Sequence, residues 1–434
     1  MKILAGGRIF ADGLLKKADL AIENGKIAKI DKNLSGEKID CIGKLILPGA
    51  IDMHVHFRDF SEKHKEDWYT GTRAAAKGGV TTVFDMVNND PPITTYERLM
   101  KKKDLAKKSV VNYGLYFGLG SDNLEEKILK KVAPHVCGFK LFMCKTTGDL
   151  LLTDPLLQKK SFQVVKKTGK VIVVHAEDQQ TIDTATNLHK NRIDFLSHAD
   201  SRPHMAESKA VQYAISCAKE YATLTHLTHI STKSALSLIR DAKYVGLDIT
   251  CDTTPTYMFF TRENLEKMGS FCKMNPPVRE KEDVKTIWED INNSIIDIIS
   301  TDHAPHTVAE KEKDFRTAPS GVPSVEMRVP LLLDAVNKKK LTLETFVKTC
   351  CTNPARRFGL DKRGEIAKGN VADLMVVDMD LTKEVRREDQ VTKCGWSPYE
   401  GMRLKGWPEK TFVNGNLVYE NGKLFYNQGE DLFR

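Results

Sequence analysis

Both ends of the chain consist of short segments in which apolar and polar residues alternate. Residues 19–30 alternate on either side of Asn24-Gly25, and residues 410–419 do so around Asn414-Gly415. A period of two is typical of half-buried strands, and an Asn-Gly pair between two such runs predicts a hairpin. Residues 372–378 add a further predicted strand. Because short strands bury little apolar surface alone, we expect both ends to pair in one small β domain.

The middle of the chain follows a different pattern, in which strand-like apolar runs alternate with longer helical segments. Eight such units predict an α/β fold, a closed parallel (β/α)8 barrel of the TIM type. The ends of such a barrel lie close together, which fits a small β-sandwich of residues 1–49 and 363–434 beside a barrel of residues 50–362. The predicted strands cover residues 47–56, 80–86, 112–120, 138–143, 171–177, 224–231, 248–255 and 297–305, and helical patterns cover residues 68–78, 122–132, 156–168 and 208–221.

Composition excludes several classes of protein. Apolar residues make up 41% and charged residues 29% of the chain, as in ordinary globular proteins, and no run of 18 apolar residues predicts a membrane span. The N-terminus lacks the apolar core of a signal peptide, and the nine cysteines include no C-x-x-C pair. We therefore expect a cytoplasmic protein with free thiols and no membrane partner.

The net charge of +8 comes partly from short lysine runs at residues 101–103 and 338–340. These runs lie in or beside helical patterns, which favours solvated helix faces over a nucleic-acid surface. A mild positive field could still attract an anionic small-molecule substrate.

Histidine and aspartate recur where the predicted barrel strands end, which is the end that carries the active site in such barrels. His54 and His56 stand at positions i and i+2 of the first strand, so their imidazoles share one side and can bind one cation. His175, His229 and Asp302 end the fifth, sixth and eighth strands. Each residue alone could be a satisfied buried histidine or a helix-capping aspartate. Their recurrence at one end of the barrel predicts a metal site.

Lys140 lies inside the apolar run of the fourth predicted strand. A buried ammonium is costly, so it must find a partner or lose its charge. One interpretation is an ion pair with a neighbouring carboxylate. The other is a neutral amine that reacts with carbon dioxide to give a carbamate, which could bridge two cations.

Several motifs follow one another along nearly the whole chain. They are Asp52-Met53-His54-Val55-His56-Phe57-Arg58, His64-Lys65-Glu66-Asp67, residues 71–82, Asn88-Asn89-Asp90-Pro91-Pro92, Gly138-Phe139-Lys140, His175-Ala176-Glu177, Met274-Asn275-Pro276-Pro277 and Thr301-Asp302-His303-Ala304-Pro305-His306. In this order they resemble the amidohydrolase superfamily, and most closely its first-class dihydroorotases. The chain departs from these relatives at Asp59-Phe60-Ser61, where they often have Glu-Pro-Gly.

The resemblance implies that His54, His56 and Asp302 bind one metal ion. It implies that His175 and His229 bind a second ion and that a carbamate on Lys140 bridges both. Zinc is the expected ion for such ligands. Two cations can share a hydroxide that attacks a ring amide, while Asp302 transfers the proton to the leaving nitrogen. The implied reaction is the reversible cyclisation of N-carbamoyl-L-aspartate to L-dihydroorotate in pyrimidine synthesis.

Arg58 is the predicted ligand of the substrate carboxylate. It lies on the same side as His56 if the strand continues, and a guanidinium matches a carboxylate bidentately. The alternative is a surface ion pair with Asp59 or Glu62.

The resemblance adds Asn88, Asn275 and His306 as substrate contacts. For the two asparagines the alternative is turn formation, because both stand near prolines. Residues 308–324 are rich in charge and then in Pro and Gly, which predicts a long mobile loop. The family pattern suggests that this loop closes over the substrate and excludes water.

Two other classes of function remain open. Allantoinase and hydantoinase or dihydropyrimidinase resemble this chain in the metal scaffold, but their substrates lack a ring carboxylate for Arg58. A non-catalytic scaffold would lack competent metal ligands, whereas all six positions are filled here. Possible protein partners are a second copy in a homodimer or aspartate carbamoyltransferase.

Overall fold

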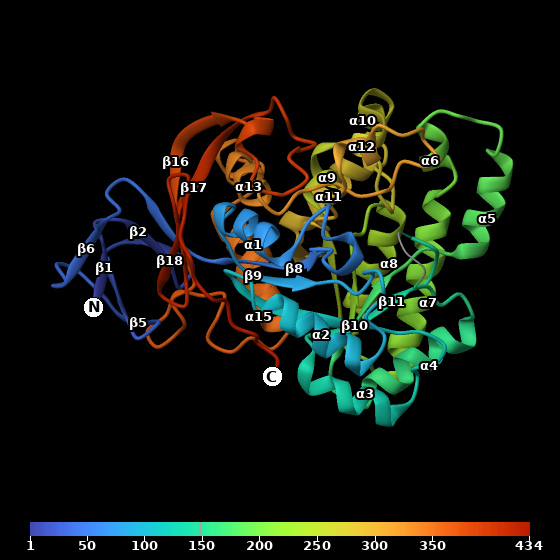
Figure 1. Ribbon diagram of the computed structural model, residues 1–434, viewed down its shortest axis with the longest axis horizontal. Coiled ribbons are helices and arrows are strands. Elements are labelled where there is room, and N and C mark those ends of the chain that lie inside the picture. Colours follow the sequence, from blue (N-terminus) through green and yellow to red (C-terminus); the bar gives the residue numbers. More distant parts are fainter. Residues whose placement is uncertain (147–149) are drawn as a thin grey trace.

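The computed structural model describes residues 1–146 and 150–434, and its centre is a barrel of parallel strands surrounded by helices (Figure 1). Neighbouring strands pair in chain order, and Val55 pairs with His303 just beyond the last strand, so the barrel closes. The predicted (β/α)8 barrel is therefore confirmed. Its strands are β8 (Ala50–Val55), β9 (Val80–Asp85), β10 (Asn112–Gly118), β11 (Gly138–Phe142), β12 (Val171–His175), β13 (Thr225–Leu227), β14 (Ile249–Thr253) and β15 (Ile298–Ile299).

The predicted first strand, residues 47–56, is divided in the structure. Residues Leu45–Pro48 form β7 of the small domain, and β8 begins only at Ala50. Gly49 stands between them because a Cβ there would lie 2.3 Å from the Thr81 side chain. The chain thus passes from one domain to the other at a position where only glycine fits.

Helices cover the outside of the barrel, and side-chain caps fix several of their starts. The Asp67 carboxylate accepts the backbone N–H groups of Tyr69 and Thr70 and so begins α1. Within the described residues, no helix is long and apolar enough to span a membrane. The helices are α1 (Trp68–Lys77), α2 (Tyr96–Ala106), α3 (Glu126–Val132), α4 (Pro155–Lys166), α5 (Gln179–Leu188), α6 (Leu196–Asp200), α7 (His204–Tyr221), α8 (Lys233–Tyr244), α9 (Pro255–Phe259), α10 (Arg262–Met268), α11 (Lys281–Asn292), α12 (Val308–Lys311), α13 (Arg328–Asn337), α14 (Leu343–Val347) and α15 (Asn353–Arg357).

Helix α3 begins four residues later than the pattern predicts. The side chain of Asn123 accepts the Gly120 N–H and donates to the carbonyls of Gly118 and Thr94. These bonds hold residues 120–123 in a turn, so the predicted start at residue 122 is wrong.

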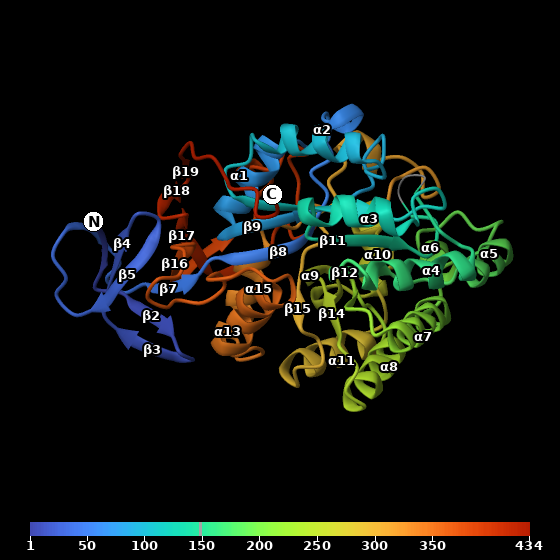
Figure 2. The ribbon, with the colours of Figure 1, turned by 90° about the horizontal axis from the view of Figure 1, so that it is seen from below.

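Strands from both ends of the chain form two further sheets at one side of the barrel, as predicted (Figure 2). Strand β7 pairs with β16 of the C-terminal part, so the two ends share one sheet. Their common core includes Ile9, Ile46, Leu374 and Phe412. The domain bounds at residues 1–49, 50–362 and 363–434 stay predictions. The strands are β1 (Lys2–Ala5), β2 (Arg8–Ala11), β3 (Leu14–Lys17), β4 (Asp19–Glu23), β5 (Lys26–Asp31), β6 (Glu37–Asp40), β7, β16 (Leu374–Glu384), β17 (Arg403–Val413), β18 (Asn416–Glu420) and β19 (Lys423–Leu424).

The segment of residues 308–324 is only partly a loop. Its first turn is α12, because Thr307 and Glu310 form a capping box there. Farther along, Val322 pairs with His303 beside the barrel mouth. The prediction of a long loop is therefore wrong for its first turn, and its mobility stays a prediction.

Candidate active site

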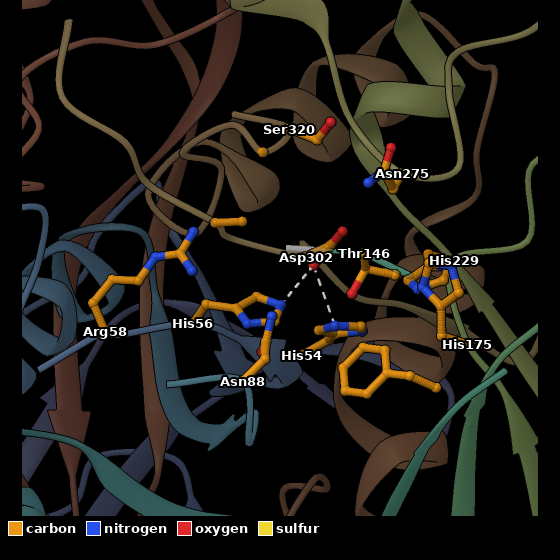
Figure 3. Close-up of a pocket in the computed structure, with 13 residues that line it drawn as sticks. His54, His56, Arg58, Asn88, Thr146, His175, His229, Asn275, Asp302 and Ser320 are labelled. Carbon is orange, nitrogen blue, oxygen red and sulfur yellow. Dashed lines mark hydrogen bonds and ion pairs between the residues drawn. The ribbon is translucent and has the colours of Figure 1, made fainter. Parts of the chain in front are cut away.

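A pocket opens where the barrel strands end (Figure 3). The predicted ligands that line it come from strand ends that are far apart in sequence, and the predicted substrate residues Arg58, Asn88 and Asn275 join them. His306 and Lys140 lie in its wall rather than on its surface, since both side chains are fully buried. The lining residues are His54, His56, Arg58, Asn88, Phe142, Thr146, His175, His229, Asn275, Asp302, Ala304, Ser320 and Gly321.

His54, His56 and Asp302 converge on one point, as the strand-end argument predicts. Oδ1 of Asp302 lies 3.2 Å from Nε2 of His54 and 3.0 Å from Nε2 of His56. All three groups are buried, and their ligand atoms lie within 4.8 Å of one another. Burial lowers the pKa of both imidazoles well below the ordinary value, so the rings are neutral. Neutral imidazoles beside a carboxylate form a donor set that suits zinc.

His175 and His229 form a second group on the other side of the pocket. Their ring centroids lie 4.4 Å apart, and the His229 ring lies 5.4 Å from that of His54. Nε2 of His175 donates to Oε2 of Glu177 at 2.7 Å, which leaves Nδ1 of this ring as the available ligand atom. Nδ1 of His229 is buried without a hydrogen-bond partner in the described part of the chain.

Nζ of Lys140 has no hydrogen-bond partner among residues 1–146 and 150–434. Its side chain is fully buried, and Nζ lies 4.9 Å from the centre of the Phe142 ring. Burial lowers the pKa of this amine. The first sequence interpretation, an ion pair with a neighbouring carboxylate, is therefore not what the structure contains. An amine whose pKa burial lowers to about 7, without a hydrogen-bond partner and between two groups of histidines, fits the second interpretation, a carbamate.

Arg58 lines the pocket, but not for the reason that the sequence suggested. Strand β8 ends at Val55, and Arg58 has a φ of 55°, so the expected extended continuation is wrong. The guanidinium is buried and donates to the carbonyl of Pro305 at 3.2 Å and to Nε2 of His306 at 3.1 Å. The alternative of a surface ion pair is wrong as well, because Arg58 is buried and pairs with neither Asp59 nor Glu62 in the described part of the chain, where Glu62 pairs with Lys65.

Three of the predicted site residues have a left-handed backbone. The φ angles are 55° at Arg58, 46° at His229 and 46° at Asp302. Such conformations cost of order 1 kcal/mol or more for residues other than glycine, and they concentrate at functional sites. The surrounding hydrogen bonds must offset this cost.

The predicted substrate residues Asn88 and Asn275 face the pocket from opposite sides (Figure 3). Oδ1 of Asn275 is buried, and no described residue serves as its hydrogen-bond partner. Turn formation therefore does not account for this side chain. Its orphaned oxygen is available to a donor on a bound molecule.

Sequence reasoning missed several residues that support the site. Asp52, quoted only as part of a motif, accepts the N–H groups of His54 and Thr301 and so joins the first and last barrel strands. Glu177 was also quoted without a role, yet it holds His175 and pairs with Arg202. Its position two residues after His175 was the available signal, because the two side chains share a face.

Comparison with known proteins identifies the family. A model described as "Amidohydrolase family" matches residues 45–418. The chain is 36% identical to a dihydroorotase of Methanosarcina acetivorans, with 98% of this chain and 93% of the relative covered. It is 32% identical to an L-hydantoinase of Paenarthrobacter aurescens, with 98% and 96% covered. Among solved structures, L-hydantoinase (dihydropyrimidinase) from Arthrobacter aurescens matches with a TM-score of 0.96 and 31% identity over 100% of this chain and 99% of that chain. The chain therefore belongs to the amidohydrolase family.

Proposed function

We propose that this chain is a dihydroorotase, which interconverts N-carbamoyl-L-aspartate and L-dihydroorotate. Its relatives of that name include the protein of Methanosarcina acetivorans and, at 35% identity, that of Pyrococcus furiosus. The observation that carries the proposal is the buried Arg58 guanidinium in the pocket wall beside the predicted metal ligands. The proposed substrate has a ring carboxylate for that guanidinium to bind.

The contacts of His306 support an anion-binding role for Arg58. Burial lowers the pKa of His306 well below the ordinary value, so its ring is neutral. Nε2 lies 3.1 Å from the Arg58 guanidinium, which can only donate, and 3.1 Å from the carbonyl of Ser320, which can only accept. One neutral ring nitrogen cannot serve both groups. A substrate carboxylate would supply the acceptor that Arg58 lacks when Nε2 donates to Ser320.

The residues fit two divalent cations, for which we propose zinc. His54, His56 and Asp302 would hold one ion. His175 and His229 would hold the other, with a carbamate on Lys140 between them. Cations in such a site polarise an amide carbonyl and lower the pKa of water.

The reaction then depends on positioned side chains. In hydrolysis, a C–O bond forms at the ring amide carbon and its C–N bond breaks. Asp302 would accept the proton of the attacking water and deliver it to the leaving nitrogen. Burial raises the pKa of this carboxyl group, which makes it a stronger base than an exposed aspartate. Arg58, Asn88, Asn275 and His306 would hold the substrate, and cyclisation is the same sequence reversed.

Two alternatives lead to different measurements. A hydantoinase, dihydropyrimidinase or allantoinase would act on cyclic amides without a ring carboxylate. A non-catalytic scaffold would fold without binding metal, although all six proposed ligands are present and lie around one pocket. A homodimer and an association with aspartate carbamoyltransferase stay predictions.

The test is a metal-replete assay of cyclisation with N-carbamoyl-L-aspartate, alongside hydrolysis of dihydroorotate, hydantoin, dihydrouracil and allantoin. We expect turnover of the first two compounds, about two equivalents of metal per chain, and loss of activity on chelation. Activity only on a compound without a carboxylate would reassign the enzyme. An inactive, metal-free and folded protein would favour the scaffold.

A further inference from the structure

A buried carboxylate behind the pocket contacts one group of predicted metal ligands directly, at His229, and the other group through Thr228, which lies against His54. Asp252, on β14, has no exposed surface and does not line the pocket. It accepts hydrogen bonds from Oγ1 of Thr228 at 2.8 Å, from the His229 N–H at 2.6 Å and from Nε2 of His226 at 2.8 Å. All three donors belong to β13 or the residues that follow it.

The first of these bonds determines where the proton of His54 lies. Thr228 has one hydroxyl proton, and it donates that proton to Asp252 because a carboxylate can only accept. The same hydroxyl oxygen lies 2.7 Å from Nδ1 of His54 and must therefore accept there. Nδ1 then carries the ring proton. The lone pair is on Nε2, the nitrogen that lies 3.2 Å from Oδ1 of Asp302.

The second bond acts on the other group of ligands. The backbone of His229 is left-handed, with a φ of 46°, which is unfavourable for a histidine. Oδ1 of Asp252 accepts the N–H of this residue, and the Ile230 N–H donates to the Asp252 carbonyl at 2.9 Å. Asp252 thereby holds the strained turn from which the His229 ring enters the pocket.

We propose that Asp252 and Thr228 are positioning residues of the metal site, in which one buried carboxylate fixes the metal-binding tautomer of His54 and the turn that presents His229. Neither residue touches the proposed substrate or ions. This inference rests on the proposed metal ligands. Neither the identity of the ligands nor the order of the strands explains how His54 and His229 are oriented, whereas Asp252 and Thr228 do.

Substitutions at Thr228 test the hydrogen bonds that link Asp252, Thr228 and His54, and they remove no proposed metal ligand. T228V keeps the shape of the side chain and removes the hydroxyl, and T228S restores it. The matched control is T250V, because Oγ1 of Thr250 lies 2.8 Å from Nδ1 of His226, a histidine outside the proposed ligand set. Each full-length protein is stripped with a chelator and titrated with Zn²⁺. The metal-free forms, labelled with ¹⁵N-histidine, report ring tautomers by NMR.

We expect T228V to weaken binding of Zn²⁺ by about 10- to 100-fold, the usual effect of losing a partner that orients a ligand. T228S and T250V should bind like the native protein. The native spectrum should contain a histidine protonated at Nδ1 and not at Nε2, and T228V should lose it.

Several results would overturn the proposal. They are native-like binding by T228V, equal weakening by T250V, an unchanged tautomer signal, or a native protein that binds no Zn²⁺. The metal titration needs no substrate, so its outcome is separate from the proposed reaction. A further outcome is that the Thr228 variants give the expected Zn²⁺ binding and tautomer signals while the protein does not turn over dihydroorotate. In that case the positioning role of Asp252 and Thr228 is supported and the proposed function is wrong.

Discussion

Lys102 and Asp85 form an ion pair of 2.6 Å inside the barrel wall, where both side chains are almost completely buried. Lys102 also donates to Oδ1 of Asn89 at 2.7 Å, and Oδ1 of Asp85 accepts the Phe57 N–H at 2.8 Å. Lys140 is equally buried but has no such partner among the described residues. Of these two buried lysines, Lys102 is satisfied by the fold and Lys140 is not.

Replacing Lys102 with methionine should destabilise the protein. The substitution leaves Asp85 as a buried charge without its partner, and we expect the free energy of unfolding to fall by about 3–5 kcal/mol. Urea-induced unfolding of the metal-free proteins measures the difference. The neighbouring Lys101 is exposed on the same helix, so K101M should change stability by less than about 0.5 kcal/mol. Equal effects of the two substitutions would remove the structural role of the pair.

Replacing Lys140 with alanine should instead abolish activity and lower the metal content, because the bridging carbamate is lost. The cavity left by the side chain can admit a small carboxylic acid, so acetate or propionate should restore part of the activity and the metal. The matched control is K102A, whose defect these acids should not relieve. Full activity of K140A without added acid would show that no carbamate is needed.

The alternation of strands and helices could be predicted because fully buried strands such as β12 are continuous apolar runs. The closure of the barrel at Val55 and His303 follows from that alternation. The start of α3 and the turn of α12 could not be predicted in this way. They depend on the side-chain bonds of Asn123 and on the capping box of Thr307, and neither changes the apolar period.

The sequence could predict those residues of the candidate site that lie at the ends of the barrel strands. His54, His56 and Asp302 meet because parallel strands place their ends together. The pairing of Lys102 with Asp85 was not predictable, since a lysine in a charged helix usually faces solvent. The contact between Thr228 and His54 also escaped prediction, because a single hydroxyl carries no periodic signal.

Replacing Arg58 with methionine should weaken substrate binding. Loss of a charged, bidentate contact should raise the KM for N-carbamoyl-L-aspartate by roughly 10- to 100-fold, with little change in metal content. Steady-state kinetics and metal analysis of the same samples measure both quantities. Arg386 is exposed in the small domain, and R386M serves as the control. An unchanged KM for R58M would exclude Arg58 from the substrate site.

Acid should destabilise the metal-free protein below about pH 6.5. Burial lowers the pKa of His54, His56 and His229, so these rings stay neutral when folded and gain protons only on unfolding. The unfolded chain therefore binds more protons than the folded protein at low pH. Stability falls as the pH drops through 6.5, the pKa of a histidine in the unfolded chain. Asp302 has the opposite effect on stability. Burial raises its pKa, so in this pH range the folded protein binds a proton at Asp302 that the unfolded chain does not bind.

Desolvation lowers the pKa values of His198 and His306 too, so at least three histidines outweigh one aspartate, and the free energy of unfolding should fall by about 2 kcal/mol or more between pH 6.5 and pH 5.5. Urea titrations in the presence of a chelator measure this change. A constant or rising stability over that interval would mean that the imidazoles can be protonated in the folded protein.

Lys311 should control the shape of the pocket without touching its contents. Its buried ammonium donates to the carbonyls of Pro319 at 2.8 Å and Gly321 at 2.9 Å, on either side of Ser320. Ser320 and Gly321 line the pocket, and the Ser320 carbonyl contacts His306. Methionine fills a similar volume but cannot donate, so K311M should release this segment.

We expect K311M to raise the KM about fivefold, which corresponds to the loss of about one net hydrogen bond. Backbone hydrogen exchange of residues 320 and 321 should become faster in the same variant. K313M is the matched control, because Lys313 is exposed two residues farther along the chain. If K311M exchanges at the native rate and keeps its KM, then the ammonium does not hold the segment, and the backbone hydrogen bonds from Gly321 to Lys273 and from Ala304 to Val322 suffice.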